Sequence, residues 1–234
     1  LLKELLADDG SIYVRIDYHF GHYIKVVMDE IFGRNYFKNE IVVNRRKKST
    51  QETHKFNVST EIILFYTKTG KFDFHKGERH RLCTFCGAEK EPEWHQMLSS
   101  GIRHPPERII RGRKQLPQKG FHWTYIQKKI DEMDNNGRIR ITDQSYTDLD
   151  GNKEKMVEYL QTENTPIDNS WMDLKGYTAS WKYPTENAEE ILARVIETSS
   201  NEGDIVLDCF AGSGTTGCVA EKLGRKWIMV DSSK

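Results

Sequence analysis

The sequence predicts an α/β fold with a parallel sheet, interrupted by an inserted α+β domain, and three observations support this prediction. Over residues 203–231, two apolar runs flank a Gly-x-Gly turn and a helical segment. Over residues 1–67, strand-like alternation and one amphipathic helical pattern follow each other. Between these parts, residues 68–180 gain glycine, proline and charge and lose regular alternation. We therefore expect two halves of one domain, at 1–67 and 181–234, separated by an insert at 68–180.

The N-terminal half has the pattern of a sheet with one covering helix. A turn at 8–10 precedes alternating residues, and apolar side chains then recur at helical spacing from Ile24 to Phe32. Gly33 follows this run and can end the helix. The expected elements are strands at 10–17, 40–44 and 61–67 and a helix over 21–32.

The C-terminal half predicts a site for a nucleotide-like ligand. A strand at 205–207 ends in Asp208, a helix at 217–223 follows the glycine turn, and a second strand at 226–230 ends in Asp231. Glycines let the backbone approach a ligand closely, and an acid after the second strand suits the hydroxyl pair of a ribose. A bare Gly-x-Gly also fits an ordinary βαβ crossover, so both interpretations stay open at this point. The dinucleotide and P-loop glycine patterns do not match.

Composition restricts the class of protein. The chain has 234 residues, 35 basic and 35 acidic side chains, and four cysteines. Its mean hydropathy is −0.70 and no apolar run approaches a membrane span, so we expect a protein without membrane segments. Few cysteines and no secretory signal favour a reducing, cytoplasmic location.

The insert carries a local excess of positive charge. Residues 101–130 contain eight Lys or Arg side chains and one acid, Glu107. Such a stretch, interleaved with aromatic residues, is typical of nucleic-acid contact. Trp123 and Trp171 also fit an alternative role as core residues of a small domain. A second basic run follows the strand at 40–44 and is either a solvated surface or a phosphate contact. The candidate DNA-binding residues are Arg45, Arg46, Lys47, Lys48, Arg111, Arg113, Lys114, His122 and Trp123.

A Cys-x-x-Cys pair in the insert suggests a zinc site. Cys83 and Cys86 have the spacing of two thiolates on one tetrahedral metal, and a glycine follows them. No second such pair exists in the sequence, so histidines would have to complete the set, with His80 and His95 the favoured ligands and His104 also available. The alternative is a free, reduced pair of thiols in a turn.

Four stretches resemble one protein family. Asp208-Cys-Phe-Ala-Gly-Ser-Gly-Thr-Thr resembles the S-adenosylmethionine (SAM) motif of DNA amino-methyltransferases, and Tyr183-Pro-Thr-Glu-Asn resembles the motif that precedes it in the permuted β class. Residues 8–17 and 22–33 resemble the sequence that follows the catalytic loop in that class. The β class includes the modification subunits of type III restriction systems. The resemblance implies a Rossmann-like SAM-dependent methyltransferase sheet, incomplete here, with the insert as a target-recognition domain.

The resemblance also implies ligands and partners. SAM is the expected cofactor, zinc a further candidate, and double-stranded DNA the expected substrate; a restriction subunit and a second copy of the chain are candidate partners. Phe210 would pack on SAM, Asp231 would accept the ribose hydroxyls, and Asp208, Thr215 and Thr185 would lie near the methionine end. The implied cofactor-binding residues are Asp208, Phe210, Ala211, Gly212, Gly214, Thr215, Asp231 and Thr185.

The family's catalytic loop, Asp/Asn/Ser-Pro-Pro-aromatic, does not occur in residues 1–234. The single Pro-Pro pair, at 105–106, lies in the insert between His104 and Glu107, which do not fit the motif. In the permuted order the loop would precede Leu1, so we expect an N-terminal truncation and assign no catalytic residue. Two positions also depart from the family pattern, with Arg15 where His is frequent and Asn187 where Lys is common.

The expected reaction is methyl transfer from SAM to an exocyclic amine of DNA, with adenine N6 favoured. Cytosine N4 is the first alternative, and a catalytically inactive DNA-binding remnant is the second. A methyltransferase acting on RNA or a small molecule would also carry the SAM motif, but the long basic insert disfavours it. Cytosine C5 chemistry lacks its usual Pro-Cys nucleophile, because the four cysteines follow Leu, Phe, Asp and Gly.

Overall fold

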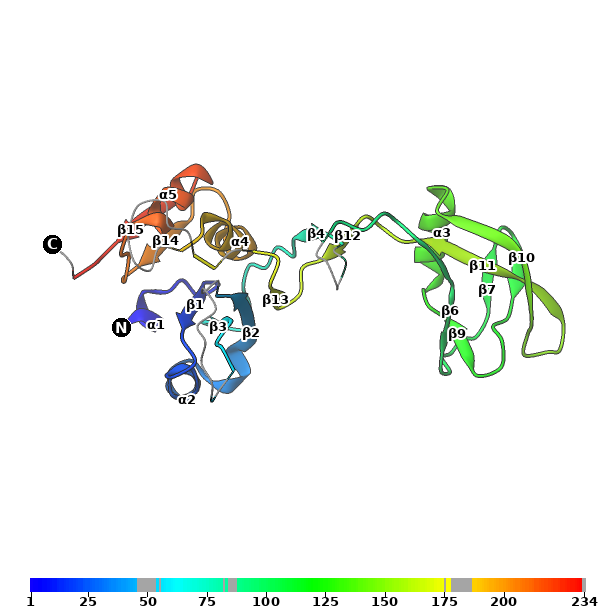
Figure 1. Ribbon diagram of the computed structural model, residues 1–234, viewed down its shortest axis with the longest axis horizontal. Helices are drawn as coiled ribbons and strands as arrows, with labels where there is room; N and C mark the ends of the chain where they lie inside the picture. Colours follow the sequence, from blue (N-terminus) through cyan, green and yellow to red (C-terminus); the bar gives the residue numbers. More distant parts are fainter. Residues whose placement is uncertain are drawn as a thin grey trace. The chain divides into compact units, whose positions relative to one another are not determined.

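The computed structural model describes residues 1–45, 54, 56–81, 83, 88–174, 176–177 and 187–232 (Figure 1). It divides the chain into two compact units, one of Leu1–Arg79 with Pro166–Lys234 and the other of His80–Thr165. The second unit is shorter than the insert at 68–180 that the sequence suggests. The reason is that Phe72, Ile167 and Trp171 pack into the core of the first unit, so the segments around them belong to it.

The first unit contains a four-stranded sheet in the order β1-β3-β2-β13. Strand β1 runs antiparallel to β3, β3 antiparallel to β2, and β13 parallel to β2. The carboxyl ends of β1, β2 and β13 therefore meet at one edge of the sheet, together with the start of β3. The elements of this half are α1 (Leu2–Leu5), β1 (Ser11–Ile16), α2 (Gly21–Phe32), a 3₁₀ turn η1 (Arg34–Tyr36), β2 (Phe37–Asn44), β3 (Thr60–Thr67) and β13 (Ser170–Trp171).

Helices cover both faces of this sheet. Leu64 and Tyr66 of β3 pack with Met28 and Phe32 of α2, while the alternating Phe65 packs on the other face with residues of α4 (Glu189–Ser199). Successive side chains of a strand point to opposite faces, so β3 is buried on both. Burial of one such large apolar side chain contributes about 1.5–3 kcal/mol. The three-layer arrangement is what an α/β fold requires.

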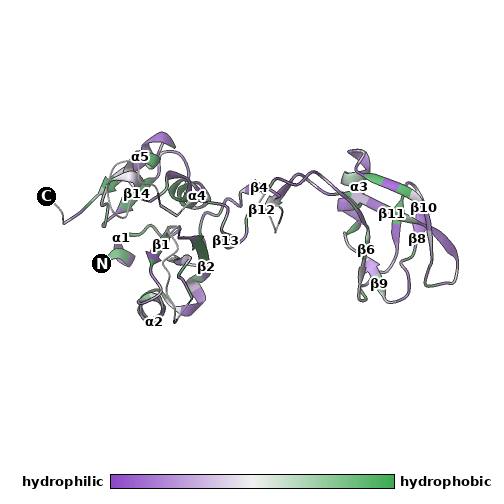
Figure 2. Ribbon diagram, viewed as in Figure 1, coloured by the Kyte–Doolittle hydropathy of each residue, from purple (hydrophilic) through white to green (hydrophobic). Residues whose placement is uncertain are grey.

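The C-terminal part forms a strand-helix-strand unit. Strand β14 (Ile205–Asp208) pairs in parallel with β15 (Lys226–Met229), and α5 (Thr215–Lys222) connects them. Val219 and Ala220 of α5 pack against Ile196 of α4. The hydrophobic stretches of helix α4 are green in Figure 2. These elements confirm the strands and helix that the sequence predicts at 205–230. Among the described residues, no helix is long and apolar enough to cross a membrane.

The second unit is richer in strands than its sequence pattern indicates. Trp123, Ile130 and Val157 belong to its core. Its strands form two- and three-stranded sheets, in which β5 pairs with β11, β11 with β10, β6 with β9, and β7 with β8. The elements are β5 (Trp94–Gln96), β6 (Leu98–Ser100), β7 (Arg108–Ile110), β8 (Arg113–Gln115), β9 (Phe121–Trp123), α3 (Gln127–Asn135), β10 (Ile139–Thr147) and β11 (Lys153–Leu160), with the paired strands β4 (Glu78–His80) and β12 (Asn164–Pro166) at the unit boundary.

Candidate cofactor site and nucleic-acid surface

Asp208 organises the turn after β14. Its Oδ1 accepts a hydrogen bond from the backbone N–H of Phe210 at 3.0 Å, and its Oδ2 accepts one from the Thr216 hydroxyl at 2.6 Å. The carboxylate thus joins the end of β14 to the first turn of α5. Hydrogen bonds to a charged acceptor are the stronger kind, so they hold the two ends of the loop between these residues together.

Two glycines give this loop its shape. Gly212 has φ 52° and Gly214 has φ 76°, a left-handed backbone that favours glycine. A Cβ added to Gly214 would meet no atom within 4 Å, so the surface beside it is open. The N–H of Gly214 donates to the carbonyl of Ala211, which closes the turn at 2.8 Å. The glycines therefore permit the turn and leave room for a ligand next to its backbone.

The ends of the two parallel strands meet at this loop. The backbone N–H of Gly212 donates to Oδ2 of Asp231 at 2.7 Å, and the N–H of Ala211 donates to the carbonyl of Val230. Asp231 consequently lies beside the glycine turn, although it is 23 residues after Asp208 in the sequence. Phe210 projects from the same turn and its side chain is 86% exposed. An exposed aromatic ring in the same turn as two strand-end carboxylates suits a ligand with a flat base and a hydroxyl pair.

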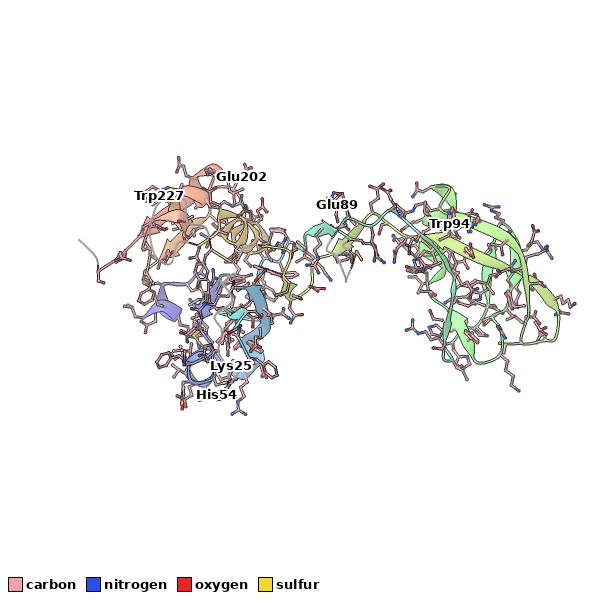
Figure 3. All side chains as sticks on the ribbon, in the orientation of Figure 1. Lys25, His54, Glu89, Trp94, Glu202 and Trp227 are labelled. Carbon is pink, nitrogen blue, oxygen red and sulfur yellow. The ribbon has the colours of Figure 1, made fainter. Side chains whose placement is uncertain are left out.

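Helix α5 lies close against β15. A Cβ on Gly217 would approach Met229 Cγ to 3.1 Å and the Trp227 ring to 3.4 Å, so glycine here allows tight helix–strand packing. Trp227, labelled in Figure 3, also donates from Nε1 to Glu221 of α5 at 2.9 Å. This packing places the start of α5, including the buried Thr215, directly after the glycine turn. Thr215 shares a hydrogen bond with Ser213 at 2.7 Å.

The sequence-predicted cofactor residues are therefore brought together, with one exception. Asp208, Phe210, Ala211, Gly212, Gly214, Thr215 and Asp231 form one continuous turn at the carboxyl ends of two parallel strands. Thr185 lies outside the described residues. The turn brings together two carboxylates, hydroxyls, backbone N–H groups and an open aromatic face. These groups fit a nucleoside that carries an amino-acid group.

A second polar cluster lies at the carboxyl ends of β1 and β2, and sequence reasoning missed it. Glu61, whose side chain is 4% exposed, pairs with Arg15 and with Arg45, each at 3.0 Å. The Tyr177 hydroxyl donates to the same carboxylate. Burial, reinforced by this hydrogen bond, raises the pKa of Tyr177 to about 12. The only sequence signal was the unusual Arg15, because a glutamate at the start of a strand is unremarkable.

The candidate DNA-binding residues have different environments. Arg113 and Lys114 are exposed on β8, and Lys114 pairs with Glu107 at 2.6 Å. Arg111 donates to Asp134 and to a backbone carbonyl of its own unit. Arg45 is mostly buried against Glu61. Arg46, Lys47 and Lys48 lie outside the described residues.

Trp123 and His122 correct the sequence interpretation. Trp123 is 2% exposed and belongs to the core of the second unit, and His122 is 8% exposed. Trp123 packs there with Met97 and Ile110, and His122 points to the opposite face of the same strand and is also buried. The core role, one of the two alternatives for Trp123, is the one that the structure shows, and Trp171 likewise packs in the first unit's core. Neither tryptophan presents a ring for base stacking.

The zinc prediction is tested only in part. His80, Cys83 and His95 are described, whereas Cys86 is not. Within the described ranges, no group of three or more His, Cys, Asp or Glu side chains could hold a metal ion. The ring centres of His95 and Tyr159 lie 5.8 Å apart in a tilted arrangement, and Nε2 of His95 lies 4.0 Å from a carboxylate oxygen of Glu93. A zinc site involving Cys86 therefore stays a prediction.

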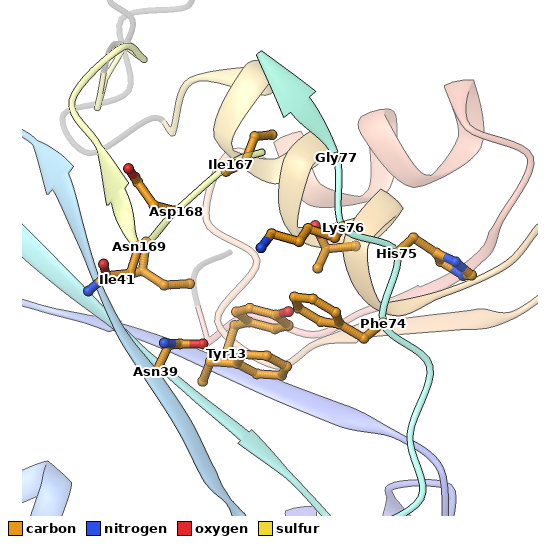
Figure 4. A pocket seen from close by; sticks show the side chains of 12 residues that line it. Tyr13, Asn39, Ile41, Phe74, His75, Lys76, Gly77, Ile167, Asp168 and Asn169 are labelled. Atoms are coloured by element: carbon orange, nitrogen blue, oxygen red, sulfur yellow. The ribbon is translucent and has the colours of Figure 1, made fainter. Parts of the chain in front are cut away.

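A pocket of about 320 Å³ lies elsewhere in the first unit (Figure 4). Tyr13, Phe65 and Phe74 form its aromatic floor, and Lys76 lines it. Its wall includes Thr198 near the C-terminus of α4, and burial raises the pKa of Tyr13 to about 12 despite its hydrogen bond with Ser199. None of the residues that line this pocket belongs to the glycine turn. We therefore do not assign it to the cofactor.

Comparisons with known proteins identify the family. A family model described as DNA methylase, N6_N4_Mtase, matches residues 1–234. The type II methyltransferase M.EcaI of Enterobacter cloacae is 32% identical over 256 residues, covering 100% of this chain and 52% of the relative. The StyLTI Mod subunit, from a type III restriction-modification enzyme of Salmonella typhimurium, is 25% identical and covers 92% of this chain and 35% of that protein. The chain thus spans about half the length of M.EcaI and about a third of the length of the Mod subunit.

Solved structures share the fold. The M1.HpyAVI–SAM complex superposes with a TM-score of 0.50 at 19% identity, covering 98% of this chain and 72% of that one. The cytosine-N4-specific PvuII DNA methyltransferase gives a TM-score of 0.51 at 13% identity, covering 99% and 62%. They confirm the Rossmann-like α/β architecture expected from the sequence. The family model, which matches the whole chain, shows that this chain belongs to the N6_N4_Mtase family of DNA methylases.

Proposed function

We propose that the protein transfers a methyl group from SAM to an exocyclic amine of DNA, with adenine N6 as the favoured target. The observation that carries this proposal is the glycine turn, in which Asp208 and Asp231 lie around an exposed Phe210 at the ends of two parallel strands. SAM, when bound, supplies an electrophilic methyl group on its sulfonium. Cytosine N4 remains the first alternative, since the PvuII enzyme of the same fold is cytosine-N4-specific.

Each cofactor residue has a proposed task. Phe210 covers one face of the adenine or the methionine part, and its exposure leaves that face available. Asp231 accepts hydrogen bonds from the ribose hydroxyls, because the Gly212 N–H holds its carboxylate beside the turn. Asp208 and Thr215 lie near the methionine end, and Thr185 is proposed to lie near its carboxylate. Gly212 and Gly214 let the backbone approach the ligand.

The second unit is proposed to recognise double-stranded DNA. Exposed basic side chains on β8, Arg113 and Lys114, are suited to phosphate contacts, which fix a protein's register on the duplex. The basic run 46–48, which lies outside the described residues, is a further candidate for such contacts. A restriction subunit is a proposed partner because a type III Mod subunit is among the relatives. A second copy of the chain, a cytoplasmic location and zinc bound by His80, Cys83, Cys86 and His95 complete the proposal.

The test is nucleoside analysis of DNA after incubation with SAM and the protein expressed from its complete gene. A Phe210→Ala variant serves as the matched control, since it alters the proposed cofactor surface without removing a buried side chain. N6-methyladenine that depends on Phe210 would support the proposal, and N4-methylcytosine would replace it by the alternative. If the folded protein binds SAM and DNA but no methylated nucleoside forms, the result would contradict the proposal and support the second alternative, an inactive DNA-binding remnant.

A further inference from the structure

Arg15 joins two parts of the chain that are far apart in the sequence. Its Nη1 donates to the carbonyl of Gly176 at 2.9 Å and to the side-chain oxygen of Asn187. Its Nε donates to Glu61 at 3.0 Å, and its guanidinium lies 4.2 Å from the centre of the Tyr177 ring. One buried side chain therefore ties β1 to residues on both sides of the segment 178–186.

The residues that Arg15 holds are also paired with each other. Tyr177 and Asn187 form an isolated antiparallel bridge, and the N–H of Ala188 points to the carbonyl of Gly176 at 3.5 Å. The Tyr177 hydroxyl donates to Glu61, which anchors this side of the bridge to β3. A lone bridge offers few hydrogen bonds of its own, so its geometry depends on the Arg15 and Glu61 side chains. We call Gly176, Tyr177, Asn187 and Ala188 the stem.

The stem lies at the carboxyl end of β1, where Arg15 contacts it, and leads directly into α4. Helix α4 begins at Glu189, directly after the stem, and runs to Ser199, and β14 then returns to Asp208. Helix α4 packs with Val206 of β14 and with Val219 and Ala220 of α5, so the helix that follows the stem belongs to the same cluster as the elements on both sides of the glycine turn. Arg15 is likewise at the carboxyl end of β1, and ligands of open α/β sheets bind at such ends.

We propose that Arg15 is a positioning residue for cofactor binding, which fixes the stem so that the chain entering α4 is held in place beside the glycine turn. This inference rests on the proposed function. Binding then occurs without first ordering the stem, which is the advantage of a preorganised site.

The geometry favours positioning over direct ligand contact. Nε and Nη1 already have protein acceptors, and Nη2 is buried and lies 3.0 Å from Glu61. One face of the guanidinium is covered by Tyr177. A ligand carboxylate would have to displace these groups to reach Arg15. The side chain therefore acts on the ligand through Gly176 and Asn187.

The first experiment measures the dissociation constant of SAM for wild type, Arg15→Gln and Arg15→Lys by calorimetry. If the stem is formed in about a tenth of the Arg15→Gln molecules, affinity falls about tenfold, because the apparent constant scales with the competent fraction. Lysine keeps the charge but lacks the planar fork that reaches several acceptors, so Arg15→Lys should weaken binding similarly. Full affinity in the lysine variant would overturn the proposal in favour of a charge effect.

A matched control separates positioning from general loss of stability. Arg194 is also a buried arginine of the first unit, with two hydrogen bonds to Asp173 and an aromatic neighbour, Trp171. Among the described residues, its hydrogen bonds and its ion pair go to Asp173 and not to the stem. Arg194→Gln should lower the melting temperature about as much as Arg15→Gln while leaving the SAM dissociation constant within about twofold. Equal losses of SAM affinity in both variants would mean that Arg15 acts only through stability.

The second experiment restores the stem without Arg15. Antiparallel bridge partners have Cα atoms about 4.5–5.5 Å apart, within the range that a disulfide spans. Tyr177→Cys with Asn187→Cys in the Arg15→Gln background should regain SAM affinity about tenfold on oxidation and lose it again on reduction. Arg15→Gln alone, oxidised and reduced, controls for the native cysteines. No gain on oxidation, while wild type binds SAM, would refute the stem mechanism; failure of wild type to bind would instead refute the proposed function.

Discussion

Glu61→Gln should destabilise the first unit selectively. The carboxylate is buried and carries the ion pairs to Arg15 and Arg45 and the hydrogen bond from Tyr177. Glutamine keeps the shape but removes the charge, and its amide NH₂ would face two guanidinium groups. Removing one partner of a buried ion pair typically costs about 3–5 kcal/mol, because the remaining charge stays buried without compensation. At about 1.4 kcal/mol per factor of ten, the lower value corresponds to more than a hundredfold change in the opening equilibrium.

Hydrogen exchange read by mass spectrometry can locate this loss. Peptides from β1, β2 and β3 should exchange at least about a hundredfold faster in Glu61→Gln, whereas peptides from β10 and β11 keep their wild-type rates. Glu158→Gln, which removes a pair with Arg140 in the second unit, is the matched control and should affect β10 and β11 alone. Exchange in β1–β3 that rises less than about threefold would refute the claim that this carboxylate holds the sheet edge together.

Three further predictions concern single side chains. Because the pKa of Tyr177 is raised to about 12, the stability that this tyrosine contributes is complete below its unfolded pKa of about 10 and is lost as pH rises through about 12. Urea unfolding of Tyr177→Phe should therefore show a smaller loss of stability between about pH 10 and pH 12 than wild type. Trp123→Ala should cost the second unit about 3–5 kcal/mol by urea unfolding, since the ring fills its core; an unchanged stability with weaker DNA binding would restore the stacking role. Arg113→Gln should lower the slope of log affinity against log salt for DNA by about one, measured by fluorescence anisotropy, and an unchanged slope would exclude a phosphate contact.

Local patterns predicted the elements whose residues interact with near neighbours in the sequence. The spacing of Ile24, Met28 and Phe32 indicated α2, and Gly33, with φ 95°, ends it as expected. The glycine turn between β14 and α5 was predictable because its residues are consecutive and the hydrogen bonds of Asp208 and Thr215 are to residues nearby in the sequence. Even Asp231 could be placed, since a βαβ unit brings the ends of its two strands together.

The sequence could not show interactions that depend on the tertiary fold. Arg15 and Asn187 are 172 positions apart, and nothing local to either indicates that they share a hydrogen bond. Both departures from the family pattern were visible, but only the structure shows that they contact each other. In the second unit, strands of three residues such as β6 and β9 are too short to show alternation, so the burial of Trp123 could not be separated from exposure.

The most direct test of the central claim is a calorimetric titration of SAM into the chain and into its Asp208→Ala variant. Alanine removes two charge-assisted hydrogen bonds, from the Phe210 N–H and from Thr216, each worth about 1.5 kcal/mol at the lower end. We expect saturable one-to-one binding by wild type and about a hundredfold weaker binding by the variant. Equal affinities, or no binding by the folded wild-type chain, would contradict a cofactor site at this turn.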